Sequence, residues 1–150
     1  MGLLGTAEEC FRRASAMNPS DLQSYQLLAN VLMASNKHSE AAKAYDDANR
    51  LAPDSSALIN QGVSLQRAGK FSEAAETYRI AIAIDPTRYE AHHNLAGCLQ
   101  DMTHPSDAIA HYARATEINP SFAASYSAMV CPAPFPHSLG LLPTSFTVCF

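Results

Sequence analysis

The 150-residue chain has no stretch of about 20 consecutive apolar residues, so nothing in it predicts a membrane-spanning helix. Its four cysteines form no Cys-x-x-Cys pair and follow no disulfide-like spacing, which favours reduced, mostly buried thiols. Lysine and arginine are scattered singly in a chain of net charge −4, which argues against nucleic-acid binding. The N-terminus, MGLLGTAEECFRRA, does not have the pattern of a secretory signal, so we expect a cytoplasmic or nuclear protein.

Catalytic motifs are also missing. The sequence contains no glycine-rich phosphate loop, nucleophile elbow or paired acid motif. His92 and His93 are adjacent and would point about 100° apart on a helix, and His104 and His111 have no carboxylate or cysteine at the spacing of metal ligands. We therefore predict surface or interface histidines, no catalytic residue, no metal site and no cofactor.

Three similar segments organise the chain: SEAAKAYDDANRLAP at 39–53, SEAAETYRIAIAIDP at 72–86 and SDAIAHYARATEINP at 106–120. Each has alanine and tyrosine at helical spacing, followed by a proline that ends the helix because it has no amide hydrogen to donate. The period of about 33 residues predicts stacked repeat units rather than one closed core. Another stretch with helical spacing precedes each segment, so each unit is expected to be a pair of helices.

The expected organisation is a repeat array over 1–130 followed by an irregular tail over 131–150. The array consists of a half repeat, three full repeats and a broken repeat, at 5–20, 21–54, 55–88, 89–122 and 123–130 respectively. The half repeat lacks a first helix and the broken repeat lacks a second helix, so both ends expose apolar faces. Either chains self-associate end to end, or the uncharged tail folds back over Tyr126, or the protein is only marginally stable.

The tail, CPAPFPHSLGLLPTSFTVCF, has no charged side chain other than His137 and fits neither helical nor strand spacing. One interpretation is a hydrophobic docking segment. The other is a truncated, alternatively spliced or wrongly predicted terminus that does not belong to the repeat fold. We favour the second, because aromatic and aliphatic residues interleaved with prolines in no regular period do not specify a structure.

The units resemble the tetratricopeptide repeat family. That family has an aromatic residue and a Leu-Gly or Leu-Ala pair on the first helix, then alanine, an aromatic residue, alanine and proline on the second. The residues that match are Tyr25, Leu28, Ala29, Ala41, Tyr45, Ala48 and Pro53, then Leu58, Gly62, Ala74, Tyr78, Ala81 and Pro86, then His92, Leu95, Ala96, Ala108, Tyr112, Ala115 and Pro120. Gln61 departs from the pattern, which usually has leucine. The resemblance implies an all-α fold, a right-handed superhelical solenoid of antiparallel helix pairs whose first helices line the concave face.

The resemblance also implies a binding surface, because such arrays bind partners in the concave groove. The polar residues that we expect to contact an extended peptide there are Gln26, Asn30, Asn60, Arg67, His93, Asn94 and Gln100. Asn60 and Asn94 are equivalent positions one repeat apart, and an asparagine amide can pair with both the N–H and the C=O of a peptide backbone. We therefore predict a protein–protein interaction scaffold in which these two residues are the anchors.

Two subfamilies differ in this groove. Members that clamp the acidic C-terminal tails of chaperones need cations where this chain has Gln26, Glu90 and Asn94, so that clamp is not expected. The repeats of O-GlcNAc transferases resemble the chain more closely, in AHHNLAGCLQ and in the asparagines Asn60 and Asn94. The alternative function is thus a fragment of the substrate-selecting repeats of an O-GlcNAc transferase-like glycosyltransferase, without its catalytic domain.

Packing and helix ends complete the expectations. Gly62 lowers helix propensity by about 1 kcal/mol relative to alanine, so a neighbouring helix should approach closely there. Ala74 should lie where the two helices of a unit cross, and Ala75 on a more exposed face. Capping boxes are expected at Ser20–Gln23 and Thr87–Glu90.

Overall fold

The computed structural model describes residues 3–122. Within that range the chain forms seven α-helices and no strand, which confirms the all-α prediction. The helices are α1 (Leu3–Met17), α2 (Leu22–Ala34), α3 (His38–Leu51), α4 (Ser55–Arg67), α5 (Phe71–Ile84), α6 (Tyr89–Asp101) and α7 (Pro105–Ile118). None of them is long and apolar enough to cross a membrane. The predicted broken repeat at 123–130 and the tail at 131–150 lie outside the described residues.

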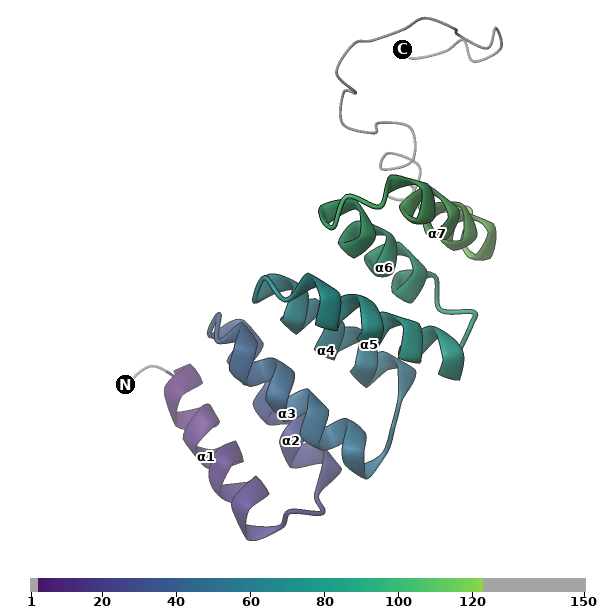
Figure 1. Ribbon diagram of the computed structural model, residues 1–150. Coiled ribbons are helices and arrows are strands. Elements are labelled where there is room, and N and C mark those ends of the chain that lie inside the picture. Colours follow the sequence, from purple (N-terminus) through teal and green to yellow (C-terminus); the bar gives the residue numbers. More distant parts are fainter. Residues whose placement is uncertain (1–2, 123–150) are drawn as a thin grey trace, which may run out of the picture.

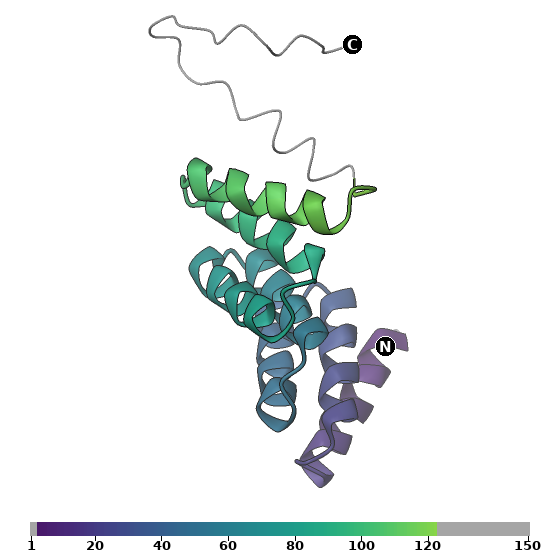
Figure 2. The same ribbon diagram turned by 90° about the vertical axis from the view of Figure 1, so that its right-hand side faces the viewer.

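The helices stack as pairs into a solenoid, with α1 and α7 at opposite ends (Figures 1 and 2). The pairs are α2 with α3, α4 with α5, and α6 with α7, while α1 packs on α2. Helix α4 also touches α6 directly, whereas open grooves separate α1 from α3 and α3 from α5. The first helices α2, α4 and α6 therefore form the concave side, and α1, α3, α5 and α7 form the convex side.

Small residues allow the helices of each pair to approach closely. The alanines at the expected crossing positions are buried: Ala41, Ala48, Ala74, Ala81, Ala108 and Ala115. A Cβ atom added to Gly62 would lie 2.5 Å from the ring of Tyr78, which is itself fully buried. The predicted close approach at Gly62 is therefore confirmed, and the approaching group is the tyrosine of the partner helix α5.

The predicted exposure of Ala75 is wrong. Ala75 is 0% exposed, like Ala74, because α6 stacks against α5 and covers this face. The equivalent residue in α3, Ala42, is also buried. At the equivalent position of α7, Ile109 is 44% exposed, and residues 3–122 contain no further helix that could cover it. Stacking between units, rather than pairing within a unit, decides the burial of this position.

The two predicted capping boxes are also wrong. Asp21, not Ser20, is the N-cap of α2, where its carboxylate accepts a hydrogen bond from the amide of Gln23 at 3.2 Å. Arg88 precedes α6 and makes no side-chain cap, while the hydroxyl of Thr87 donates to Asp85 at 2.7 Å. Both helices thus begin one residue later than the sequence pattern indicates.

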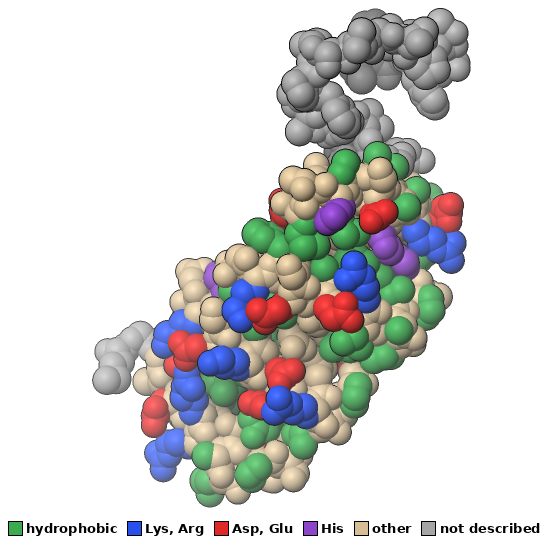
Figure 3. Space-filling view, viewed as in Figure 1, with side chains coloured by type: hydrophobic (Ala, Val, Ile, Leu, Met, Phe, Trp, Pro, Cys, Tyr) green, Lys and Arg blue, Asp and Glu red, His purple; other side chains and the backbone are tan. Residues whose placement is uncertain are grey.

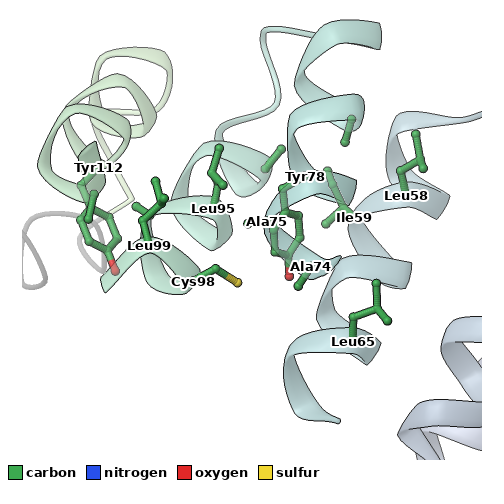
Figure 4. Packing of buried hydrophobic residues seen from close by; sticks show 14 of the residues in the cluster. Leu58, Ile59, Leu65, Ala74, Ala75, Tyr78, Leu95, Cys98, Leu99 and Tyr112 are labelled. Atoms are coloured by element: carbon green, nitrogen blue, oxygen red, sulfur yellow. The ribbon is translucent and has the colours of Figure 1, made fainter. Parts of the chain in front are cut away.

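The buried apolar residues form two clusters. One lies among the helices before α4 and includes Leu28, Leu32 and Tyr45. The other is centred on α4 to α7 and includes Tyr78 and Leu95 (Figure 4). The division runs through α3, whose Ala42 belongs to the second cluster while Ala41, Ala44 and Tyr45 belong to the first.

Candidate functional site

A hollow of about 300 Å³ lies on the concave side between α2 and α4. Its lining comes mainly from the first helices and is mostly polar: Gln26, Asn30, Tyr45, Asp54, Ser56, Ala57 and Asn60. Three of the predicted groove residues, Gln26, Asn30 and Asn60, therefore meet in one hollow. Arg67, His93, Asn94 and Gln100 are not part of it.

Two of the predicted groove residues bind tyrosines of their own units. Asn30 Oδ1 accepts a hydrogen bond from the hydroxyl of Tyr45, and Gln100 Oε1 accepts one from Tyr112 at 3.2 Å. Burial raises the pKa of both hydroxyls, so they remain protonated and act as donors. Part of the hydrogen-bonding capacity of Asn30 and Gln100 is thus used within the fold.

Gln66, which is not among the seven predicted peptide contacts, has the same role in the unit between them. Its Oε1 accepts a hydrogen bond from the hydroxyl of Tyr78 at 3.3 Å. The recurring tyrosines could have predicted this bond from the sequence. A buried tyrosine hydroxyl needs a hydrogen-bond partner, and the facing first helix is the nearest source of one.

The two predicted anchors lie on adjacent first helices, Asn60 on α4 and Asn94 on α6. Asn60 is exposed and Asn94 is partly buried. Among residues 3–122, neither side-chain amide hydrogen-bonds to another part of the chain. Both amides therefore retain donor and acceptor groups for a ligand, which is a geometric precondition for the predicted role.

The remaining two predicted residues differ in burial. Arg67 is exposed in the last turn of α4, where its charge interacts favourably with the helix dipole. The half-buried ring of His93 packs against Tyr112 and Phe122, with ring centroids 5.3 and 5.0 Å apart. Burial lowers the pKa of His93, so the ring favours its neutral form within this aromatic group.

One ion pair lies on the concave side, at the start of α6. Arg88, in the loop before α6, donates to Ser56 Oγ at 2.8 Å and lies 3.4 Å from a carboxylate oxygen of Glu90. These contacts link α4 to the start of α6 across the concave side. A strongly charged ligand would have to compete with an existing ion pair here.

His92 and His111 form a pair between α6 and α7, with their Nδ1 atoms 3.2 Å apart. Burial, the neighbouring histidine and Arg114 lower the pKa of His92. Burial and Arg79 lower the pKa of His111, opposed by Asp107, which lies one turn earlier and was overlooked in the sequence. Within the described range, no three histidine, cysteine, aspartate or glutamate residues are grouped to hold a metal ion.

The two described cysteines have opposite environments. Cys98 is buried, and burial followed by the charge of Asp101 raises the pKa of its thiol to about 11. Cys10 is exposed on α1, contrary to the expectation that the thiols are mostly buried. The Cys98 thiol is thus kept in its unreactive, protonated form.

Two tetratricopeptide repeat models match the chain, one over residues 1–56 and the other over residues 65–130. The chain belongs to the tetratricopeptide repeat family. Its helix pairs are the repeats of that family, and its concave hollow lies between the first helices of two successive repeats.

Solved structures share this fold. A crystal structure of MamA has a TM-score of 0.80 at 17% sequence identity, and the match covers 84% of this chain and 74% of that chain. The crystal structure of YrrB, described as a tetratricopeptide repeat protein with an unusual peptide-binding site, has a TM-score of 0.73 at 20% identity. That match covers 84% of this chain and 66% of YrrB. At sequence identities this low, the structural match shows a common repeat architecture and nothing more specific.

Among curated proteins, the Protein O-mannosyl-transferase TMTC1 of Homo sapiens is 29% identical over 125 residues, which is 80% of this chain and 14% of that protein. The Mus musculus protein of the same name is 27% identical over 125 residues and is covered to 13%. The chain thus spans only a small part of the length of these relatives.

Proposed function

We propose that the chain is a protein–protein interaction scaffold that binds an extended peptide segment of a partner in its concave groove. The observation that carries this proposal is the concave hollow between α2 and α4, which joins Gln26, Asn30 and Asn60. The peptide-binding site described for YrrB, a protein of the same fold, supports it. The partner and its compartment, cytoplasmic or nuclear, stay predictions.

Asn60 and Asn94 are proposed to hold the peptide backbone. The fold uses neither side-chain amide within residues 3–122, and each amide can donate to a peptide C=O and accept from a peptide N–H. Gln26, Asn30, Arg67, His93 and Gln100 are proposed to lie beside the peptide. Because recognition through the backbone does not read side chains, the groove should accept varied sequences.

The test is to select binders from a phage-displayed library of random peptides on the full chain, and to measure their affinity by calorimetry. Asn60→Ala/Asn94→Ala should remove up to four hydrogen bonds, at about 0.5–1.5 kcal/mol each. The melting temperature should hardly change. Salt should have a mild effect, because the charged groups in the groove are few and partly paired.

A convex-side change, Lys43→Glu, is the control. It should leave these affinities unchanged. If the double asparagine variant binds the selected peptides as tightly as the wild type, while Lys43→Glu abolishes binding, recognition lies on the convex side and the proposal is wrong.

A second candidate is the repeat region of a larger glycosyltransferase. The similarity to an O-mannosyl-transferase favours this broad class, and it supports the O-GlcNAc transferase-like alternative only loosely. Sequencing the complete natural transcript tests it. A reading frame that joins these repeats to a transferase domain would support the candidate, and a transcript that ends without one would contradict it.

Self-association through the ends of the array also stays a prediction. Leu3 and Leu4 are exposed at the start of α1, where a preceding first helix would pack in a longer array. Sedimentation at increasing protein concentration should show larger species, and Leu4→Glu should reduce them. A monomer at every concentration would contradict the prediction.

A further inference from the structure

Two histidines face each other between α6 and α7. His92 is only 7% exposed, whereas His111 is half-buried and keeps contact with solvent. Their Nδ1 atoms are 3.2 Å apart, their ring centroids are 5.4 Å apart and the ring planes differ by 31°. The two nitrogens therefore lie on the facing edges of the rings. Figure 3 shows histidine side chains (purple) at the surface over these two helices.

The repeat fold does not require this pair. The preceding repeat packs the same helices with Leu58 at the position of His92 and Thr77 at the position of His111. Both of these residues are buried without an imidazole partner. Burial lowers the pKa of both histidines, which shows that their placement costs solvation of the charged form. Two imidazoles between helices thus require an explanation other than packing.

The surroundings of His92 favour one tautomer. Burial and His111 lower the pKa of His92, and the backbone carbonyl of Pro86 opposes this. Because Nδ1 faces His111, the carbonyl favours a proton on Nε2, although Nε2 has no hydrogen bond of ordinary geometry within residues 3–122. A proton on Nε2 leaves the lone pair of Nδ1 directed at His111. Histidine ligands of metal ions commonly have this arrangement, with the other N–H facing a backbone carbonyl.

The distance between the two nitrogens suits a metal ion. Zinc binds imidazole nitrogen at about 2.0–2.1 Å in a tetrahedral shell, so two nitrogen ligands of one zinc ion lie about 3.3 Å apart. The separation of 3.2 Å between the two Nδ1 atoms matches this value. A slight rotation of each ring about its Cβ–Cγ bond would aim both lone pairs at one ion. The backbone already places the two rings for chelation.

Charged groups around the pair favour a cation. Asp107, one turn before His111 on α7, makes no ion pair within residues 3–122, and its charge opposes the lowering of the His111 pKa by burial and by Arg79. Arg79 on α5 and Arg114 on α7 would repel a cation. Each of them is paired with a glutamate of its own helix, at 3.2 and 2.8 Å respectively. The unpaired carboxylate of Asp107 therefore decides the local charge.

We propose that His92 and His111 bind Zn²⁺ through their Nδ1 atoms, with water completing the coordination on the solvent side. Zinc then replaces the hydrogen atom between the two nitrogens. That proton moves through solvent to Nε2 of His111, so both rings stay neutral and no proton is released. The sequence did not lead to this site, because the two residues lie 19 positions apart on different helices.

The test is a titration of the full chain with Zn²⁺ at neutral pH, followed by calorimetry. Zn²⁺ should bind and Mg²⁺ should not, because Mg²⁺ prefers oxygen ligands. The melting temperature should rise with the Zn²⁺ concentration, because unfolding separates the two rings and destroys the site. EDTA should reverse the rise.

A matched pair of variants assigns the effect to these histidines. His92→Leu/His111→Thr, which installs the residues of the preceding repeat, should weaken Zn²⁺ binding by about tenfold or more and remove the rise in melting temperature. His104→Ala should change neither, because this exposed histidine precedes α7 and makes no side-chain cap. An equal rise in the wild type and the double variant would overturn the proposal, as would a wild type that Zn²⁺ does not stabilise.

Discussion

The junction of α3 with α4 and the junction of α5 with α6 occupy equivalent places in successive repeats, yet their chemistry differs. At the first, Asn49 and Gln61 are joined by a hydrogen bond that extends to Asp46. At the second, the same positions hold Ile82 and Leu95, which contribute to an apolar cluster. The helices follow the same arrangement at both junctions. The repeat backbone therefore tolerates either chemistry, and the side chains decide whether the junction is polar or apolar.

The largest expected effect on stability is a difference between two glycines on the first helices of these repeats, Gly62 on α4 and Gly97 on α6. Gly62→Ala should destabilise the fold by about 1–3 kcal/mol, because its methyl group would overlap the buried ring of Tyr78. Gly97→Ala should instead stabilise by up to about 1 kcal/mol, because the nearest atoms, on Gln66 and Tyr112, would lie at ordinary contact distances and alanine has the better helix propensity. Urea denaturation measures both, and equal shifts would show that the close approach at Gly62 is not real.

A second experiment converts the polar junction into its apolar counterpart. Gln61→Leu alone should destabilise by about 1–3 kcal/mol, because it leaves the buried amide of Asn49 without its partner. Adding Asn49→Ile should recover most of this loss, since the pair then reproduces Ile82 and Leu95. A double variant as unstable as the sum of the single variants would show that the two side chains are not coupled.

The turns inside the repeats provide a smaller contrast. Gly69 has a φ of 77°, and its counterpart Thr103 has a φ of 62°, a conformation unfavourable for a β-branched residue. Thr103→Gly should therefore stabilise the fold by about 1 kcal/mol, and Gly69→Thr should destabilise it by about as much. Thermal denaturation of the two variants tests this, and a destabilised Thr103→Gly variant would contradict it.

The smallest effect concerns pH. The pKa values of His92 and His111 are lowered in the folded protein, so folding favours their neutral forms. Their contribution to stability is fully present above the ordinary pKa of 6.5, and falls as the pH drops through 6.5 towards the lowered folded values. Melting temperature against pH should show this decline.

The preceding repeat supplies the control for the pH effect. It has Leu58 and Thr77 at the positions of His92 and His111. The double variant His92→Leu/His111→Thr therefore replaces the two histidines by the residues of the preceding repeat, neither of which titrates near neutral pH. The double variant should lose most of the decline and retain the part due to His93, whose pKa is also lowered. An unchanged pH profile would show that the pair makes no contribution.

The helix pairs could be predicted from the sequence because alanine, tyrosine and proline recur with the period of the repeat. The burial of Ala75 could not, because it depends on how tightly the next pair stacks. Gln61 was visible as a departure from the family pattern, but its partners Asn49 and Asp46 lie on another helix, and local spacing does not identify them. Three members of the predicted concave set share a hollow, because they lie on neighbouring first helices, while the peptide contacts of all seven remain predictions.

The division of the apolar core into two clusters near α3 and α4 has a consequence for cooperativity. In a linear stack, each unit is held by its own stability and by the interfaces with its neighbours. Ala42 of α3 carries the second cluster across this junction, but the amides of Asn49 and Gln61 replace an apolar pair there. The block α1–α3 should therefore be coupled less strongly to the block α4–α7 than a fully apolar interface would couple it. The concave hollow spans this boundary, with lining residues from α2, α3 and α4. A bound peptide would therefore fasten the two blocks together and make the array unfold as one.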